Sequence, residues 1–309
     1  MVKISSETKR RSIIGGTLSL LLLVLIFAEM SFTVTSRKKI ILPPQVIFSS
    51  QALERLTLEA KAVFLYDFST GKILYEKNAE AQLPLASLTK IMTAYVGKNE
   101  LPKNTLVVID QKALQTEGES GLGENERFKL DDLLRLILIE SSNDGAAAVS
   151  GAFSERVEEN TETFVEKMNR EAQSLGLAQT YFLTETGLDR GEEVAGAYGS
   201  AHDVAFLLWR AYKKYPDIFG ATEYSKLQIS SFDLKVYEVI NTNESLSSVP
   251  GTIASKTGFT DLADGNLALI FEAGPMHPIG VVVLGSSKEG RFTDATKLAQ
   301  GVLQGFLSE

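Results

Sequence analysis

Residues 84–96 read Pro84-Leu85-Ala86-Ser87-Leu88-Thr89-Lys90-Ile91-Met92-Thr93-Ala94-Tyr95-Val96. Pro84 lies at the end of an extended segment, and the apolar residues that follow predict a helix beginning at about Ser87. Side chains three positions apart lie on the same face of a helix, so the Lys90 ammonium folds back over the Ser87 hydroxyl. A serine with a basic partner at that distance is one known form of activated nucleophile.

The same serine–lysine spacing occurs three more times, beginning at Ser6, Ser36 and Ser69. These copies lie in a basic tail, in a charged linker and across a turn, whereas Ser87 alone opens an apolar helix. Even there, an ordinary alternative is a helix-capping serine followed by a surface lysine. The pair therefore needs support from other parts of the chain.

A second polar cluster lies between two apolar helical segments. The strongly apolar helix predicted for Leu130 to Glu140 runs into Ser141-Ser142-Asn143-Asp144, and another small-residue helix follows. Polar side chains between buried helices are costly unless they are hydrogen-bonded or functional. Serine and asparagine are also the commonest helix caps, so capping and function both remain open for this cluster.

A third cluster, Lys256-Thr257-Gly258, lies within a strand predicted for Thr252 to Thr260. Strand alternation places Lys256 and Gly258 on one face and Thr257 on the other. A glycine inside a strand lets a ligand or another backbone approach closely. This strand is therefore a candidate wall of a binding site.

The composition excludes several kinds of chemistry. The 309 residues are 44% hydrophobic and include no cysteine, so the chain has enough apolar surface for a substantial core but no thiol nucleophile. His202 and His277 are the only histidines, and a zinc site would depend almost wholly on carboxylates. We expect no metal and no cofactor. Asp203 follows His202, but neighbouring side chains on a helix point apart, so we expect no catalytic dyad there.

The N-terminal part of the chain has the layout of a membrane anchor. Basic residues in a tail at 1–11 precede an uncharged leucine-rich run, and no convincing cleavage site follows. We therefore predict a transmembrane anchor at 12–34 with its N-terminus in the cytoplasm, then a linker at 35–52. The folded catalytic domain is predicted at 53–309.

The charge is divided unevenly along the chain. Residues 1–39 hold seven basic and two acidic residues, which leaves −13 on the remainder of a chain whose net charge is −8. An acidic folded domain argues against nucleic acid as a partner.

The order of the predicted elements indicates the fold. An extended pair with a turn at Asp67-Phe68-Ser69-Thr70-Gly71 opens the domain, and a second pair, Leu267 to Glu272 and Ile279 to Gly285, precedes a closing helix. The segments between these pairs are largely helical. We predict an α/β domain of the α+β type, with one antiparallel sheet flanked by helices.

Three motifs now stand in order along the chain: Ser87-x-x-Lys90, Ser141-x-Asn143 and Lys256-Thr257-Gly258. Over about residues 55–309 the chain resembles the low-molecular-mass penicillin-binding proteins, specifically the D-alanyl-D-alanine carboxypeptidases. The likeness includes Asn241-Thr242-Asn243 and Arg291-Phe292. It implies a β-lactamase/transpeptidase-like fold with an all-helical subregion.

The resemblance also implies roles for the matched residues. Ser87 would attack the carbonyl between two D-alanines, and Lys90 would take its proton. Burial and the positive charge of Lys256 would lower the pKa of Lys90, so that its amine is neutral. Ser141 would relay a proton to the departing amine, and Asn143 would hold the substrate amide and orient Lys90.

The remaining roles concern substrate binding. Backbone N–H groups of Ser87 and Phe259 would form the oxyanion hole. Thr257 and Arg291, beside Gly258, would bind the terminal carboxylate of the substrate. The implied partners are peptidoglycan stem peptides ending in D-Ala-D-Ala, β-lactam antibiotics and, through the anchor, the membrane.

Other functions remain open at this level. A D-alanyl endopeptidase or a β-lactamase would use the same residues, although no glutamate-containing loop suited to β-lactam hydrolysis is evident after Ser141. A non-catalytic cell-wall-binding module is the alternative from another class. In each case the expected location is the cell membrane, with a single span and the folded domain outside the cytoplasm.

Overall fold

The structure is a computed structural model, and it describes residues 53, 55–118, 120–156 and 162–307. The predicted tail at 1–11, anchor at 12–34 and linker at 35–52 lie outside these residues. Within the described part of the chain, no helix is both long enough and apolar enough to cross a membrane.

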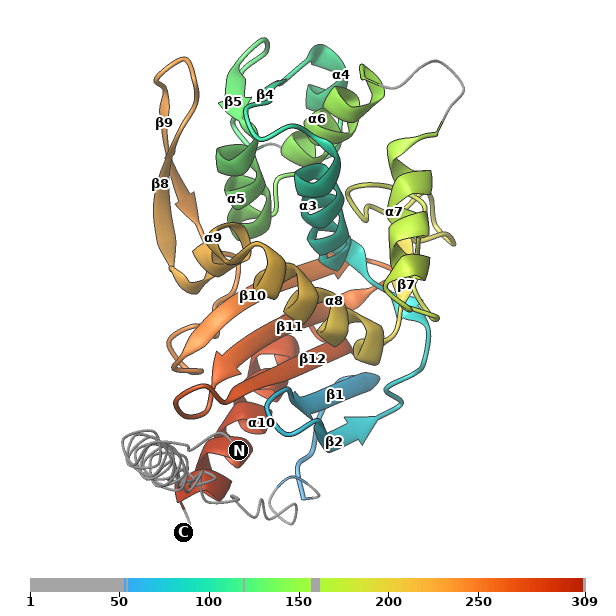
Figure 1. Ribbon diagram of the computed structural model, residues 1–309. Coiled ribbons are helices and arrows are strands. Elements are labelled where there is room, and N and C mark those ends of the chain that lie inside the picture. Colours follow the sequence, from blue (N-terminus) through green and yellow to red (C-terminus); the bar gives the residue numbers. More distant parts are fainter. Residues whose placement is uncertain (1–52, 54, 119, 157–161, 308–309) are drawn as a thin grey trace, which may run out of the picture. The chain divides into compact units, whose positions relative to one another are not determined.

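A five-stranded antiparallel sheet forms the base of the domain, in the order β10-β11-β12-β1-β2 (Figure 1). Its strands come from the two ends of the domain: β1 (Ala62–Asp67), β2 (Lys72–Lys77), β10 (Thr252–Thr260), β11 (Asp264–Glu272) and β12 (Pro278–Ser286). The first and last segments of the domain meet where β1 pairs with β12, with Ala62 opposite Leu284. This pairing joins the N-terminal strands of the domain to its C-terminal strands in one sheet.

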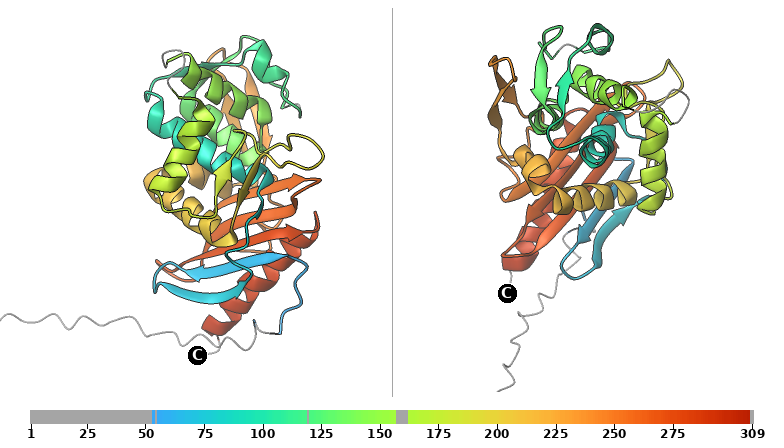
Figure 2. Two further views of the ribbon diagram at one scale, coloured as in Figure 1. Left: turned by 90° about the vertical axis from the view of Figure 1, so that its right-hand side faces the viewer. Right: turned by 45° about the horizontal axis from the view of Figure 1, so that its top comes forward.

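The sheet is covered on both faces, because alternate residues of its strands enter two separate cores. Phe64 and Val282 belong to the core shared with the helical region, whereas Val63 and Val281 pack toward the C-terminal helix α10 (Gly290–Leu307). Figure 2 shows α10 on the side of the sheet away from helix α8 (Ala201–Lys214). Burial on both faces explains why β12 consists almost entirely of apolar residues.

The helical region lies on the α8 side of the sheet (Figure 1). Its helices are α3 (Thr89–Glu100), α4 (Gln111–Leu114), α5 (Leu130–Glu140), α6 (Asn143–Ser154), α7 (Phe164–Ser174) and α9 (Pro216–Phe219). Nine of the twelve residues of α3 are buried, so α3 forms the centre of this region. Asp131 and Asp132 lie in the first turn of α5, where carboxylates favour the helix dipole.

Short elements complete the domain. They are η1 (Ala86–Leu88), η2 (Gly220–Glu223), β3 (Leu83–Pro84), β4 (Leu106–Val108), β5 (Arg127–Lys129), β6 (Tyr181–Phe182), β7 (Ala197–Gly199), β8 (Lys226–Ser230) and β9 (Val236–Ile240). Strands β8 and β9 form a hairpin beside α5 (Figure 1).

The prediction of an antiparallel sheet flanked by helices is confirmed. The helix predicted to begin at about Ser87 is present: Ser87 lies in the 3-10 turn η1, and the α-helix follows directly from Thr89. The tighter turn still leaves Ser87 and Lys90 on the same side.

Candidate active site

Ser87 and Lys90 meet at the N-terminus of α3. The Lys90 Nζ atom lies 2.8 Å from Ser87 Oγ, and it also bonds Asn143 Oδ1 at 2.6 Å and the Thr186 carbonyl at 2.9 Å. These three oxygens match the three hydrogen positions of an ammonium. Lys90 is fully buried, so its amine is held in one position.

The surroundings of Lys90 make it a base near neutral pH. Burial lowers the pKa of Lys90 to about 7, against the opposing effect of the Glu185 carboxylate. The charged amine loses its hydration when the side chain is buried, and this favours the neutral form. A buried lysine with a pKa in this range can act as a base at neutral pH.

The junction of α5 and α6 supplies the second pair of polar side chains. Ser141 ends α5 in the left-handed conformation, with φ of 69° and ψ of 30°, and Ser142 caps α6 by accepting a hydrogen bond from Gly145 N–H. Capping is thus carried out by Ser142, and the side chains of Ser141 and Asn143 are available for other contacts. Asn143 donates to the Glu117 carbonyl at 2.7 Å, which leaves its oxygen for Lys90.

Strand β10 brings a second amine into the site. Lys256 Nζ donates to Ser141 Oγ and to the Thr257 carbonyl, both at 2.9 Å. Burial lowers the pKa of Lys256 well below its ordinary value, and the positive charges of Lys90 and Arg291 lower it further. The predicted charge effect thus acts on Lys256, whereas burial is the cause of the shift at Lys90.

Gly258 lets β10 pass close to the serine. A Cβ atom at this position would lie 2.8 Å from the Leu85 carbonyl oxygen and 3.2 Å from Ser87 N. Backbone atoms cannot yield as a flexible side chain can, so glycine is required here. The next residue, Phe259, is 45% exposed and stands at the rim of the site.

Arg291, at the start of α10, reaches the same strand. Its Nη1 atom donates to the Gly258 carbonyl at 2.7 Å, and its side chain is almost completely buried. Its Nε atom is buried and has no hydrogen-bond partner among the residues that the structure describes. A guanidinium with an unused donor beside Gly258 is suited to an anionic group.

Three contacts in this site had no role in the sequence analysis: the carbonyls of Glu117 and Thr186, and the Thr242 hydroxyl, which lies 2.6 Å from Thr257 Oγ1. Main-chain carbonyls leave no signal in a sequence. The loop that carries Thr186 can approach because the next residue, Gly187, has φ of 81° and lies directly against the Ala86 carbonyl. For Thr242, the Asn241-Thr242-Asn243 motif was the available signal.

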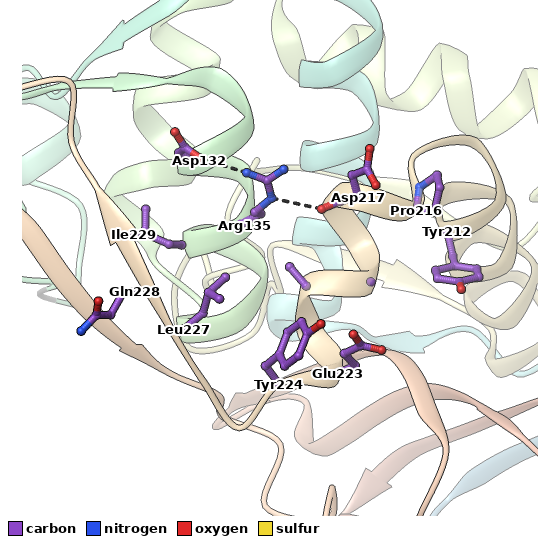
Figure 3. A pocket seen from close by; sticks show the side chains of 12 residues that line it. Asp132, Arg135, Tyr212, Pro216, Asp217, Glu223, Tyr224, Leu227, Gln228 and Ile229 are labelled. Carbon is purple, nitrogen blue, oxygen red and sulfur yellow. Dashed lines mark hydrogen bonds and ion pairs between the residues drawn. The ribbon is translucent and has the colours of Figure 1, made fainter.

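A separate hollow of about 540 Å³ lies between α5, α9, η2 and β8 (Figure 3). It is lined by Arg135, which donates to Asp132 and to the Asp217 carbonyl, and by several other polar residues. None of the predicted site residues lines this hollow. Its size alone does not make it the reactive site, because its lining residues include no nucleophile paired with a base.

The constellation around Ser87 has the parts needed for acyl transfer. It combines a serine with an amine whose pKa is about 7, a second serine bonded to a second amine, and a buried guanidinium. All nine predicted site residues belong to the segments that meet here. The reactive groups come from η1, α3, the α5–α6 junction, β10 and α10.

Comparisons with known proteins identify a family for this chain. The peptidase S11 family, described as D-alanyl-D-alanine carboxypeptidase, matches residues 48–287. D-alanyl-D-alanine carboxypeptidase DacF from Bacillus subtilis is 33% identical over 250 residues, which cover 79% of this chain and 62% of that protein. The chain spans about three fifths of the length of the curated relatives it matches.

Solved structures show the same fold. A D-alanyl-D-alanine carboxypeptidase from Mycobacterium tuberculosis is 25% identical, with a TM-score of 0.70 over 82% of this chain and 93% of that one. Penicillin-binding protein D2 from Listeria monocytogenes, in its cefotaxime-bound form, is 26% identical, with a TM-score of 0.64 over 81% of this chain and 98% of that one.

Proposed function

The chain belongs to the peptidase S11 family of D-alanyl-D-alanine carboxypeptidases, and from this premise we propose that it removes the terminal D-alanine from peptidoglycan stem peptides. The observation that carries the proposal is the fully buried Lys90 amine, 2.8 Å from the Ser87 hydroxyl. A lysine with a pKa of about 7 is a base matched to its working pH.

In the acylation step, Ser87 Oγ attacks the carbonyl carbon between the two D-alanines, and neutral Lys90 takes the hydroxyl proton. The negative charge that develops on the carbonyl oxygen is stabilised by the backbone N–H groups of Ser87 and Phe259. The close approach of β10 at Gly258 supports this arrangement, because it sets the two backbones side by side.

The peptide bond breaks when the leaving amine receives a proton. Ser141 relays to that amine the proton that Lys90 took from Ser87, so Lys90 becomes neutral again, and Lys256 Nζ, 2.9 Å from Ser141 Oγ, holds the Ser141 hydroxyl in place. Asn143 holds the substrate amide and keeps Lys90 in place through its 2.6 Å contact. Water then attacks the Ser87 ester, neutral Lys90 takes the proton of this water and returns it to the Ser87 oxygen, and the shortened peptide leaves.

The terminal carboxylate of the substrate is bound by Arg291 and Thr257. The buried Nε of Arg291, which lacks a partner, and the Thr257 hydroxyl, held by Thr242, support this assignment. Recognition of a free carboxylate at this end is what distinguishes a carboxypeptidase from an endopeptidase.

β-Lactams react at the same site: Ser87 attacks the β-lactam carbonyl, the ring opens, and the opened molecule stays bound to Ser87 as an ester. The relative from Listeria monocytogenes was solved with cefotaxime bound. We place the catalytic domain outside the cytoplasm, where the peptidoglycan substrate lies, with the segment 12–34 as its single membrane anchor.

A direct test is covalent labelling of the full chain by a fluorescent penicillin. The wild type should become labelled, and Ser87→Ala should abolish the label while the melting temperature stays within a few degrees. Mass spectrometry should locate the adduct on the peptide that contains Ser87. Labelling of Ser87→Ala, or a labelled wild type that releases no D-alanine from a D-Ala-D-Ala peptide, would contradict the proposal.

A further inference from the structure

A cluster of three side chains with metal-binding atoms lies outside the Ser87 site. His202 and Asp203 begin helix α8, and Glu80 lies in the connection between β2 and β3. His202 Nδ1 lies 3.3 Å from Asp203 Oδ1 and 3.6 Å from Glu80 Oε1, and the three ligand atoms are all within 4.8 Å of one another.

This arrangement corrects the expectation that His202 and Asp203 point apart. The imidazole packs against Phe64, with ring centres 5.1 Å apart, and against Phe206, with ring centres 4.7 Å apart. These two contacts hold the ring so that Nδ1 faces the carboxylate of Asp203 rather than the solvent.

Asp203 is fixed in an orientation that suits a ligand. Its Oδ2 atom accepts hydrogen bonds from Gln179 N–H at 2.8 Å and from Thr180 Oγ1 at 3.0 Å. The side chain is 3% exposed, and its second oxygen faces His202. Hydrogen bonds from outside the ligand set commonly orient metal-binding carboxylates in this way.

The distances within the cluster are those expected between ligands of one metal ion. Ligand atoms about 2.0–2.2 Å from a tetrahedral Zn²⁺ are about 3.4 Å from each other. The two distances from His202 Nδ1, 3.3 and 3.6 Å, match this separation, and the contact of 3.3 Å is a long hydrogen bond to Asp203. Glu80 is 65% exposed and can rotate to complete the third contact.

The charge balance also favours a cation. Two carboxylates and a neutral imidazole carry a charge of −2, which a divalent ion neutralises. The positive N-terminal end of α8 opposes a cation, but by a partial charge of only about one half. His nitrogen together with carboxylate oxygens is a donor set that zinc accepts.

We propose that Glu80, His202 and Asp203 form a site for a divalent transition-metal ion, with Zn²⁺ as the natural ion and water as the fourth ligand. The ion would tie the β2–β3 connection to the N-terminus of α8. This site is separate from the proposed peptidase chemistry, and its loss leaves the serine–lysine pair in place.

The test is a titration of the full chain with zinc chloride, after purification through a tag without histidine. Isothermal calorimetry should show one equivalent bound. At a hundredfold excess of zinc over the dissociation constant, the melting temperature should rise by roughly 5–10 °C.

Two variants remove one ligand each with little risk to the fold. Glu80→Gln changes an exposed side chain, and His202→Phe keeps an aromatic ring against Phe64 and Phe206. Each should weaken zinc binding at least tenfold and reduce the thermal shift, while penicillin labelling is retained as evidence of a folded domain. His277→Gln is the matched control, because this histidine bonds Asp67 at a different place in the fold.

Unchanged zinc binding by Glu80→Gln and His202→Phe would overturn the proposal. So would equal losses in His277→Gln, which would mean that zinc is bound non-specifically by histidine. Absence of both heat and thermal shift in the wild type would have the same meaning.

Discussion

The environment of Lys90 differs strongly from that of an ordinary surface lysine. Its side chain is completely buried, and burial lowers its pKa from 10.5 to about 7. Contacts with Ser87, Asn143 and the Thr186 carbonyl hold the amine in place. Burial therefore changes the pKa of the amine while these contacts fix its position. Position and a matched pKa are the two requirements for a general base.

The proposed role of Lys90 predicts a particular pH dependence of acylation. Below pH 7 Lys90 is protonated and unable to take the Ser87 proton, so the acylation rate should fall about tenfold per pH unit. Above pH 7 the amine is neutral and the rate should level off. Stopped-flow measurements of penicillin acylation between about pH 5 and 9 would check this.

An unperturbed lysine would give a different profile, because the rate would continue to rise toward about pH 10. That result, or a rate independent of pH, would assign the base to another group. Melting temperatures measured across the same pH range serve as the control for loss of folded protein.

In the proposed function, Arg291 is the residue that recognises the free carboxylate of the substrate. Loss of a charge-assisted contact to a carboxylate typically costs about 1.5–3 kcal/mol, which corresponds to roughly ten- to a hundredfold in kcat/KM. Arg291→Ala should therefore slow release of D-alanine from a free D-Ala-D-Ala peptide by that factor. The same peptide with an amidated C-terminus should react poorly with wild type and variant alike.

Arg291 is buried and also bonds the Gly258 carbonyl, so its removal can loosen the fold. Arg291→Lys, which keeps the charge but loses the planar geometry, and a melting curve for each variant separate the two effects. Equal losses on the free and the amidated substrates would show that Arg291 is structural.

At the scale of elements, the site forms where β10, the edge strand of the sheet, meets η1 and the α5–α6 junction. The left-handed Ser141 ends α5 and directs its hydroxyl to Lys256 on β10. The tight turn at Ala86 brings Ser87 against Gly258 on the same strand. Three short irregular segments therefore set the geometry, and the regular elements hold them in place.

Because β10 and η1 are in close contact at Gly258, we expect that adding one methyl group there lowers both stability and the rate of acylation. Gly258→Ala would place Cβ 2.8 Å from the Leu85 carbonyl oxygen, so the two backbones must separate. Overpacking of this kind costs about 1–3 kcal/mol, and we expect loss of stability together with at least a tenfold slower acylation. Thermal unfolding and penicillin labelling measure the two effects.

Gly151→Ala is the matched control for this substitution. Gly151 lies inside α6, and a Cβ atom there would meet nothing within 4 Å. Alanine in a helix interior should raise stability by about 0.5–1 kcal/mol, with acylation unchanged. Normal acylation by Gly258→Ala would show that the approach of β10 is not required.

At the scale of the whole molecule, the sheet has a core on each face, and the site lies at one end of it beside the helical region. The core between α10 and the sheet holds Arg291 against β10, while the core on the α8 side holds α3 and Lys90. Both halves of the site are thus supported by packed elements, which is the condition for a fixed distance between reactive groups.

The sequence also predicts where the whole protein resides. The basic tail at 1–11 and the apolar segment 12–34 should keep the full chain in the membrane fraction with its N-terminus intact. Carbonate extraction followed by N-terminal sequencing measures both properties, and a chain lacking residues 1–34 should appear in the soluble fraction. A mature N-terminus near residue 30 would show instead that the segment is removed.

The sequence alone was sufficient to identify the three motifs and to predict the antiparallel sheet flanked by helices. These features follow from local physics: the three-residue spacing of Ser87 and Lys90 on a helical turn, and the apolar strand patterns near both ends of the domain. The family resemblance added roles for residues such as Arg291, which no local pattern assigns.

Only the tertiary structure decided the contacts between segments far apart in the chain. In the tertiary structure the Thr242 hydroxyl contacts the Thr257 hydroxyl, and the Thr186 carbonyl accepts a hydrogen bond from Lys90. The tertiary structure also brought Glu80 to His202. A sequence pattern records what each segment favours, but the partner of a polar atom is fixed by the packing of other segments around it, and so is the extent of burial that lowers the pKa of Lys90.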